Sequence, residues 1–155
     1  MSQKPTSQKI ICTNRQAGFR YEILEKFEAG LMLVGSEVKS LREGHANIND
    51  SHVMHRGNEL ILLNAHISHY APANQFNHEP LRPRKLLLHQ HEIERLIGKM
   101  KERGLTLIPT KFYFKKGIAK CELALAKGKK LHDRREDIKK KVQNREIERA
   151  VRGRK

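Results

Sequence analysis

The chain has 155 residues, which suits one compact domain with an appendage, and its 32 Lys and Arg against 17 Asp and Glu give a formal net charge of +15, which indicates a polyanionic partner. No apolar run approaches the roughly 20 residues of a membrane span, and the N-terminal segment lacks the apolar stretch of a secretion signal. We therefore expect a cytoplasmic protein with no membrane partner.

The N-terminal third of the chain carries short apolar runs of the kind that form β-strands. We predict strands at residues 9–12, 21–27 and 31–34. Gly30 and Gly35 are expected to interrupt them, because glycine weakens a strand interior and often marks a bend. This part of the chain therefore predicts β-structure with short connections.

The next segment predicts a short helix followed by a β-hairpin. Residues 37–43 have the composition of a helix of two turns. Val53 and Met54 lead through a turn at residues 56–58 into a second apolar run at 60–64, and Ile67 continues the pattern. Gly57 at the centre of this turn is typical of a tight hairpin.

A basic stretch precedes the apolar residues 86–88, which read as a buried strand. Its cations are Arg82, Arg84 and Lys85, and Pro80 and Pro83 hold it extended. Two interpretations stand side by side, a solvated loop in front of a core strand and a loop that binds RNA phosphates. Charge alone does not separate them.

Residues 89–103 predict the clearest helix of the chain. From Ile93 onward, apolar residues recur at i, i+3, i+4 and i+7, which places them on one helix face. Gly104 can end the helix in the left-handed conformation. Strands are then expected at residues 105–108, 111–115 and 118–125.

The connections between these last strands carry turn signals of their own. Lys116 and Gly117 fit a tight turn between the last two strands, and Pro109 suits an edge or a bend. Antiparallel strands with helical insertions predict a mainly β fold, an OB-like antiparallel β-barrel with flanking α-helices. A four-stranded sheet of the RRM type is the alternative, but its aromatic RNP1 pattern is absent.

A change of composition near Gly128 divides the chain into a body, residues 1–128, and a basic tail, residues 129–155. The tail has too few apolar residues to offset the ordering cost of about 1–2 kcal/mol per residue, so we expect it to be disordered alone and helical when bound. Ile147 and Val151 are spaced by four, as a one-sided helix requires. The alternative is a plain solubilising tail.

No residue pattern indicates catalysis or a bound metal. The nine histidines lack the spacing of a zinc site, and Cys12 and Cys121 form neither a CxxC pair nor a disulfide framework, so both are expected to be reduced. Hydroxyl and carboxylate residues form no recognisable catalytic motif. We expect no cofactor, no metal and no enzymatic activity, which speaks against an RNA-modifying enzyme.

Five segments together resemble the SmpB family, the SsrA-binding proteins, in the order that family has them. They are residues 27–30 (FEAG), 35–42 (GSEVKSLR), 77–89 (NHEPLRPRKLLLH), 105–109 (LTLIP) and 124–135 (ALAKGKKLHDRR). The resemblance covers nearly the whole chain apart from the first few residues.

The resemblance implies an OB-like barrel that binds the tRNA-like domain of tmRNA. Such a protein helps deliver tmRNA, with elongation factor Tu and GTP, to stalled ribosomes for trans-translation, which rescues the ribosome and tags the nascent chain. Its tail enters the decoding centre of the 16S rRNA and the vacant mRNA channel. A monomer is expected. A general RNA chaperone that holds RNA by charge alone is the competing hypothesis.

The resemblance also implies particular contacts with tmRNA. Arg15 would neutralise a phosphate, Asn14 and Glu28 would pair with base edges, and Leu87 would cover an unstacked base, although Leu87 could equally belong to the core. Phe19 follows Gly18 where many relatives carry Arg-His, and could stack on a base instead. The predicted RNA-binding residues are Asn14, Arg15, Phe19, Glu28, Lys39, Arg42, Arg84, Lys85, Leu87, His89, Lys127, Lys129 and Lys130.

The tail residues are expected to contact ribosomal RNA through charge and stacking. His132 offers a planar ring at the start of this segment, before the Asp133-Arg134-Arg135 triplet. The predicted ribosome-binding residues are His132, Asp133, Arg134, Arg135, Lys139, Lys140, Lys141, Arg145, Ile147 and Arg149.

Overall fold

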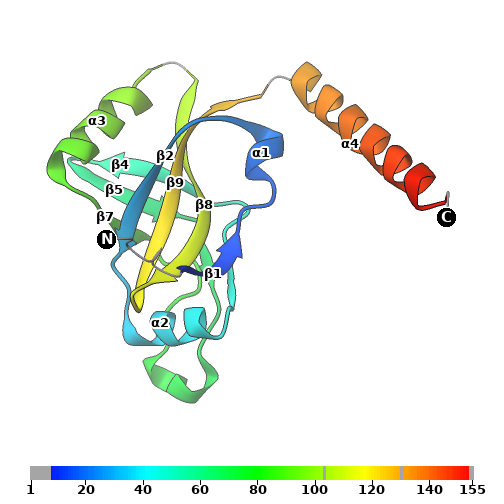
Figure 1. Ribbon diagram of the computed structural model, residues 1–155. Helices are drawn as coiled ribbons and strands as arrows, with labels where there is room; N and C mark the ends of the chain where they lie inside the picture. The colour runs from blue at the N-terminus through cyan, green and yellow to red at the C-terminus, as the bar shows by residue number, and fades with distance from the viewer. Residues whose placement is uncertain (1–7, 103, 130, 154–155) are drawn as a thin grey trace, which may run out of the picture.

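A computed structural model describes residues 8–102, 104–129 and 131–153, with the backbone alone at 131–134. Seven strands form one antiparallel sheet, in the order β1-β8-β4-β5-β7-β2-β9. Their bounds are β1 Gln8–Thr13, β2 Tyr21–Leu31, β4 His52–Arg56, β5 Glu59–Leu63, β7 Arg84–Leu87, β8 Leu105–Lys115 and β9 Ile118–Gly128. Because β8 also pairs with β9, the sheet closes into a barrel, as Figure 1 shows. The predicted OB-like barrel is therefore confirmed.

Within the described residues, four α-helices and smaller elements accompany the barrel. The helices are α1 Ala17–Arg20, α2 Gly35–Arg42, α3 Gln90–Met100 and α4 Leu131–Arg152. A 3-10 segment, η1, covers Ala71–Phe76, and the short strands β3 (Ala46–Asn47) and β6 (His66–Ile67) pair with each other. Helices α1 and α2 lie at opposite ends of the barrel (Figure 1). No helix in the described ranges is long and apolar enough to cross a membrane.

Two turns follow the sequence-based expectation closely. Lys116 and Gly117 have φ angles of 52° and 75°, which is the backbone of a tight hairpin turn, and they join β8 to β9. Gly57 takes φ 61° in the turn between β4 and β5. Gly104 also has a positive φ of 79°, but α3 ends at Met100 with Lys101 as its C-cap, so the prediction that Gly104 ends this helix is wrong.

Two strand predictions need correction. The break expected at Gly30 does not exist, because β2 runs through it, and residues 32–34 form a loop instead of a strand. A Cβ at Gly30 would lie 3.2 Å from the Cβ of Leu87 on the neighbouring strand, so glycine permits close strand pairing here. The two strands predicted on either side of Pro109 are one strand, β8, with an irregular register between Pro109 and Lys111.

The main core fills the barrel, and α3 contributes to it. Leu62, Leu107, Phe112 and Leu123 are fully buried, and Leu96 of α3 packs in the same cluster. A smaller cluster lies beneath α1, outside the barrel wall, and consists of Ala17, Ile108, Ala124 and Ala126, with Tyr21 and Ile23 packed against it. This second cluster anchors the segment that connects β1 to β2.

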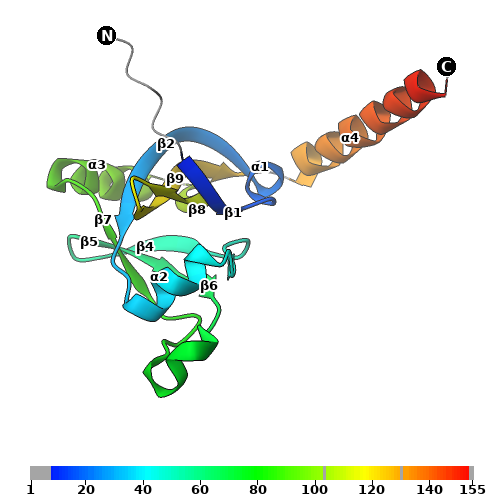
Figure 2. The same cartoon turned by 60° about the horizontal axis from the view of Figure 1, so that its bottom comes forward.

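The described part of the tail is helical, the form expected of it when bound. Helix α4 begins beside α1 and projects away from the barrel (Figures 1 and 2). In three places an acidic residue stands four positions before a basic one, a spacing that stabilises a helix. These pairs are Glu136 and Lys140, Asp137 and Lys141, and Glu148 and Arg152. The large apolar side chains described on this helix are exposed to between 48% (Val142) and 69% (Val151). Ile138 and Val142 share one face of the helix, whereas Ile147 and Val151 lie on the opposite face, because 3.6 residues make one turn; both pairs are exposed.

Candidate nucleic-acid interface

The seam between β2 and β7 brings three predicted RNA-contacting residues onto one outer face of the barrel. Gly30 pairs with Leu87, so Glu28, two residues earlier on β2, and His89, two residues later than Leu87, lie on the same side of this ladder. Leu87 is 45% exposed, whereas its neighbour Leu86 is buried in the core. The alternative that Leu87 belongs to the core is therefore excluded. His89 is exposed, and its ring stacks on His91 at 5.7 Å.

Glu28 is held as an anion by two residues of β8. The Tyr113 hydroxyl donates a hydrogen bond to Oε2 of Glu28, and Lys115 Nζ lies 3.4 Å from the same oxygen. The hydrogen bond from Tyr113, more than the charge of Lys115, lowers the pKa of Glu28 below its usual value. Burial, followed by this contact with Glu28, raises the pKa of Tyr113. The carboxylate is thus fixed, charged and exposed, ready to accept hydrogen bonds from base edges.

Asn14 and Arg15 lie in the connection from β1 to α1, three strands away from Glu28. The Asn14 side chain donates to the Pro109 carbonyl at 3.1 Å and accepts from the Gln16 amide at 3.2 Å, so it shapes the connection itself. The Arg15 side chain is exposed, and within the described ranges its guanidinium has no ion pair. Arg15 is therefore free to neutralise a phosphate.

The stretch before β7 is not a phosphate-binding loop, because its arginines point inward. Arg84 is fully buried and forms an ion pair with Glu37, which is also fully buried. The Nη1 atom of Arg84 donates a hydrogen bond to the Ala65 carbonyl. Arg82 pairs with the same carboxylate, and Lys85 lies 2.9 Å from Glu59. The prediction that Arg84 binds RNA is therefore wrong. Alternation along β7 puts Arg84 on the same side as the core residue Leu86.

Lys39 and Arg42 are exposed on α2, at the end of the barrel away from α1 (Figure 1). The Lys39 Nζ lies 5.5 Å from the centre of the Tyr70 ring. The structure therefore gives these two cations a separate surface and does not bring them to the seam between β2 and β7.

The predicted RNA-binding lysines at the end of β9 and just after it differ in their surroundings. Lys127 is exposed. Lys129 instead joins the tail to the body, because its Nζ donates to the Gly18 carbonyl at 2.9 Å and pairs with Asp137. Its hydrogen bond lowers the pKa of Asp137. The prediction that Lys129 is a free phosphate contact is thus corrected, and Lys130 lies outside the described residues.

A groove of about 370 Å³ separates α1 from the start of the tail. Phe19, half buried, lines it on the body side, and Lys141 lies 5.8 Å from the centre of its ring. Farther along α4, the predicted ribosome-contacting side chains are all exposed: Arg135, Lys139, Lys140, Lys141, Arg145, Ile147 and Arg149. The side chains of His132, Asp133 and Arg134 lie outside the described set.

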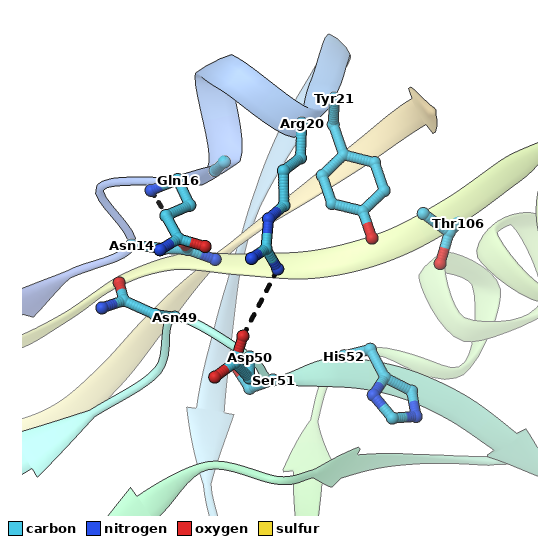
Figure 3. A pocket seen from close by; sticks show the side chains of 10 residues that line it. Asn14, Gln16, Arg20, Tyr21, Asn49, Asp50, Ser51, His52 and Thr106 are labelled. Carbon is cyan, nitrogen blue, oxygen red and sulfur yellow. Dashed lines mark hydrogen bonds and ion pairs between the residues drawn. The ribbon is translucent and has the colours of Figure 1, made fainter. Parts of the chain in front are cut away.

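A polar cavity of about 230 Å³ opens next to Asn14, at the α1 end of the barrel. Figure 3 shows the Tyr21 ring and the His52 ring on opposite sides of it, with Thr106 between them at one end. The Arg20 guanidinium lies 3.3 Å from the Asp50 carboxylate at the other end. The sequence did not indicate this cavity, because its walls come from α1, β2, β4 and β8, and only barrel closure brings them together.

The possible metal ligands and the two cysteines have the following surroundings in the described residues. No group of three or more His, Cys, Asp or Glu in the described ranges is placed to hold a metal ion. Cys12 and Cys121 are both free thiols, on strands separated by β8. Burial raises the pKa of Cys12 to about 11 and also raises the pKa of Cys121 well above its usual value.

These features define a class: an OB-like barrel with a charged, partly apolar outer face and a basic helical extension. The family model described as SmpB protein matches residues 11–153, and the chain belongs to this family. It is 60% identical over 141 residues to an SsrA-binding protein of Syntrophobacter fumaroxidans, covering 91% of this chain and 88% of that protein. It is 58% identical over 153 residues to one of Desulforudis audaxviator, covering 99% of each.

The likeness extends to a solved structure. A chain described as "tmRNA-SmpB: a journey to the center of the bacterial ribosome" superposes with a TM-score of 0.66 at 49% sequence identity, covering 77% of this chain and 85% of that one. The family resemblance predicted from the sequence motifs is therefore confirmed.

Proposed function

We propose that the protein binds the tRNA-like domain of tmRNA with its body, residues 1–128, and delivers it to stalled ribosomes for trans-translation. The proposal is supported by the family membership and by relatives named SsrA-binding protein, one of them matching 99% of this chain. The observation that carries it is the seam where Glu28, Leu87 and His89 share one exposed face.

This face suits a folded RNA whose bases are partly unstacked. The ionised Glu28 accepts hydrogen bonds from base edges, and the exposed Leu87 covers a base that has left its stack. Arg15 supplies a cation for the backbone from the β1–α1 connection. The protein acts as a monomer in the cytoplasm and performs no bond chemistry, while elongation factor Tu and GTP join through the tmRNA complex.

The tail, residues 129–155, reaches the decoding centre and the vacant mRNA channel in this proposal. Helix α4 already has exposed cations along its length and an exposed apolar pair, Ile147 and Val151. Ribosomal RNA supplies phosphates for the cations and base surfaces for this pair. The Lys129 contact with Gly18 sets where this helix starts relative to the body.

Competition binding tests the proposal directly. The tRNA-like domain of tmRNA and an unrelated folded RNA of equal length compete for the protein at physiological ionic strength, and we expect a clear preference for the former. Charge reversal at Arg15 combined with Glu28→Ala should remove that preference, whereas Arg56→Glu, which reverses an exposed cation at the end of β4, should not. Equal binding of both RNAs by the wild-type protein would instead support a general RNA chaperone.

A further inference from the structure

Lys129 connects the base of helix α4 to the body. Its backbone amide donates a hydrogen bond to the Arg20 carbonyl at 2.9 Å, and its Nζ donates one to the Gly18 carbonyl at 2.9 Å. Both ends of the lysine are therefore fixed on α1. The same Nζ pairs with the Asp137 carboxylate in the second turn of α4, so this ion pair holds the tail helix beside α1 (Figures 1 and 2).

The groove between α1 and α4 carries a surplus of positive charge. Among the described residues that line it, four cations face one carboxylate, that of Asp137. The cations are Arg15, Lys129, Lys140 and Lys141. The volume of about 370 Å³ is large enough for a small ligand. A phosphate group suits such a place, because its oxygens accept charge-assisted hydrogen bonds from several cations at once.

Arg15 links this groove to the RNA face of the proposed function. Its side chain is exposed, and within the described ranges its guanidinium has no ion pair. In the proposed function it neutralises a phosphate of the RNA bound to the body. Because Arg15 also lines the groove, an RNA backbone held by Arg15 lies at the edge of the space that Lys129 and Asp137 share.

The ion pair between Lys129 and Asp137 can be exchanged. The two side chains keep 19% and 30% of their surface exposed, so water and salt screen their attraction. An RNA phosphate brings the charges of its neighbours along the strand, whereas Asp137 is one carboxylate. A phosphate in the groove also repels Asp137, since both are anions. The RNA backbone and the base of α4 thus compete for one lysine.

We propose that RNA bound to the body releases the tail helix, because a backbone phosphate in this groove replaces Asp137 as the partner of Lys129. The proposal rests on the proposed function and adds an order of events to it. In the free protein the tail stays docked on α1. When the RNA is loaded, the tail becomes available to the ribosome. Asp137 acts in this sequence as a placeholder for the phosphate.

The distance between body and tail reports the release. Asn58→Cys, in the turn between β4 and β5, and Gln143→Cys, on α4, carry spin labels in a chain that also has Cys12→Ser. Double electron–electron resonance measures the distance between the labels. The free protein should give one narrow distance distribution. Saturation with the tRNA-like domain of tmRNA should shift and broaden it, because α4 is then no longer tied to α1.

Asp137→Asn separates the groove from a general effect of charge. It should give the broad distribution without RNA, and it should tighten RNA binding by about twofold or more, because the RNA no longer competes for Lys129. Glu146→Gln is the matched control, since it removes one negative charge from another exposed position of α4. It should change neither the distance nor the affinity. Unchanged unfolding midpoints in both variants show that the body is intact.

The proposal is overturned if the distance distribution of the wild type stays the same in the saturated complex, or if Asp137→Asn matches Glu146→Gln in either measurement. An unrelated folded RNA of equal length separates this outcome from a failure of the proposed function. If both RNAs bind equally well and both release the tail, the tmRNA assignment fails and the groove proposal stands. If the tRNA-like domain binds selectively while the tail stays docked, the groove proposal fails and the tmRNA assignment stands.

Discussion

Glu37 of α2 and Arg84 of β7 form an ion pair in which neither side chain has any solvent-exposed surface. The pair joins residues 47 positions apart and fixes α2 against the end of the barrel. Glu37 also accepts a hydrogen bond from the Val34 backbone amide at 3.1 Å, which caps the first turn of α2. Removing Glu37 leaves the Arg84 guanidinium buried without a counter-ion, whereas Glu37 would still have Arg82 if Arg84 were removed.

The first prediction concerns this pair. The substitution Glu37→Gln should lower the free energy of unfolding by about 3–5 kcal/mol, because it leaves the Arg84 guanidinium buried without a counter-ion. Urea unfolding monitored by circular dichroism measures the change. Glu25→Gln is the control: its ion pair with Arg95 is exposed, so we expect a change below about 1 kcal/mol. Equal effects of the two substitutions would contradict the assigned role.

Lowering the pH should destabilise the fold through the same residue, Glu37. Burial by itself raises the pKa of Glu37, but hydrogen bonds from Arg84, Arg82 and the Val34 amide outweigh it and hold the pKa below its usual value. The folded-state pKa is therefore lower than the unfolded value of about 4.3, so this stabilisation is complete above that pH and is lost as the pH falls through the folded-state pKa. Unfolding midpoints measured below about pH 4.5 should fall less steeply in Glu37→Gln than in the wild type.

Leu87 offers a test of the seam that leaves the core untouched. Leu87→Ala should weaken binding to the tRNA-like domain of tmRNA by about 1 kcal/mol, roughly fivefold in Kd, because it removes apolar surface that would cover a base. Met54→Ala, on β4, is the control, since Met54 is 44% exposed against 45% for Leu87. Comparable loss from both substitutions would mean that the seam has no special part in binding.

The division between body and tail predicts two separable failures. A chain ending at Gly128 should retain its preference for the tRNA-like domain, yet fail to support tagging of nascent chains from a nonstop message in a reconstituted translation system. Log affinity of the full chain for single-stranded RNA should fall with log salt at about −0.7 per phosphate neutralised, and the shortened chain should show a shallower slope. A chain ending at Gly153 is the control. Tagging by the shorter chain would refute the role of the tail.

The two thiols should be unreactive in the folded protein. Cys12 and Cys121 both pair with Phe112, from opposite sides, so their Cα atoms are about 9–10 Å apart, beyond the reach of a disulfide. With the pKa of Cys12 near 11, little thiolate exists at pH 8. Iodoacetamide should label the native protein slowly and the urea-unfolded protein fast. Rapid native labelling at either residue would contradict the described packing.

Local signals in the sequence were enough for the mainly β fold, the helix at α3 and the turn at Lys116 and Gly117. Each depends on residues close together in the chain: apolar spacing over a few helical turns, or a glycine that takes a positive φ angle. The excess of positive charge and the five motifs can likewise be recognised in the sequence alone. The charge indicated an RNA partner, and the motifs indicated the family.

Only the closed barrel decided which predicted cations are available to RNA. Arg84 and Lys85 are neighbours in the sequence, yet one is fully buried and the other half exposed, because alternate residues of a strand face opposite sides. The Tyr113 contact that keeps Glu28 ionised spans 85 residues, and the cavity between Tyr21 and His52 needs four elements at once. Such contacts arise from strand register, which the local chain does not encode, because pairing partners are set by how the whole hydrophobic core closes.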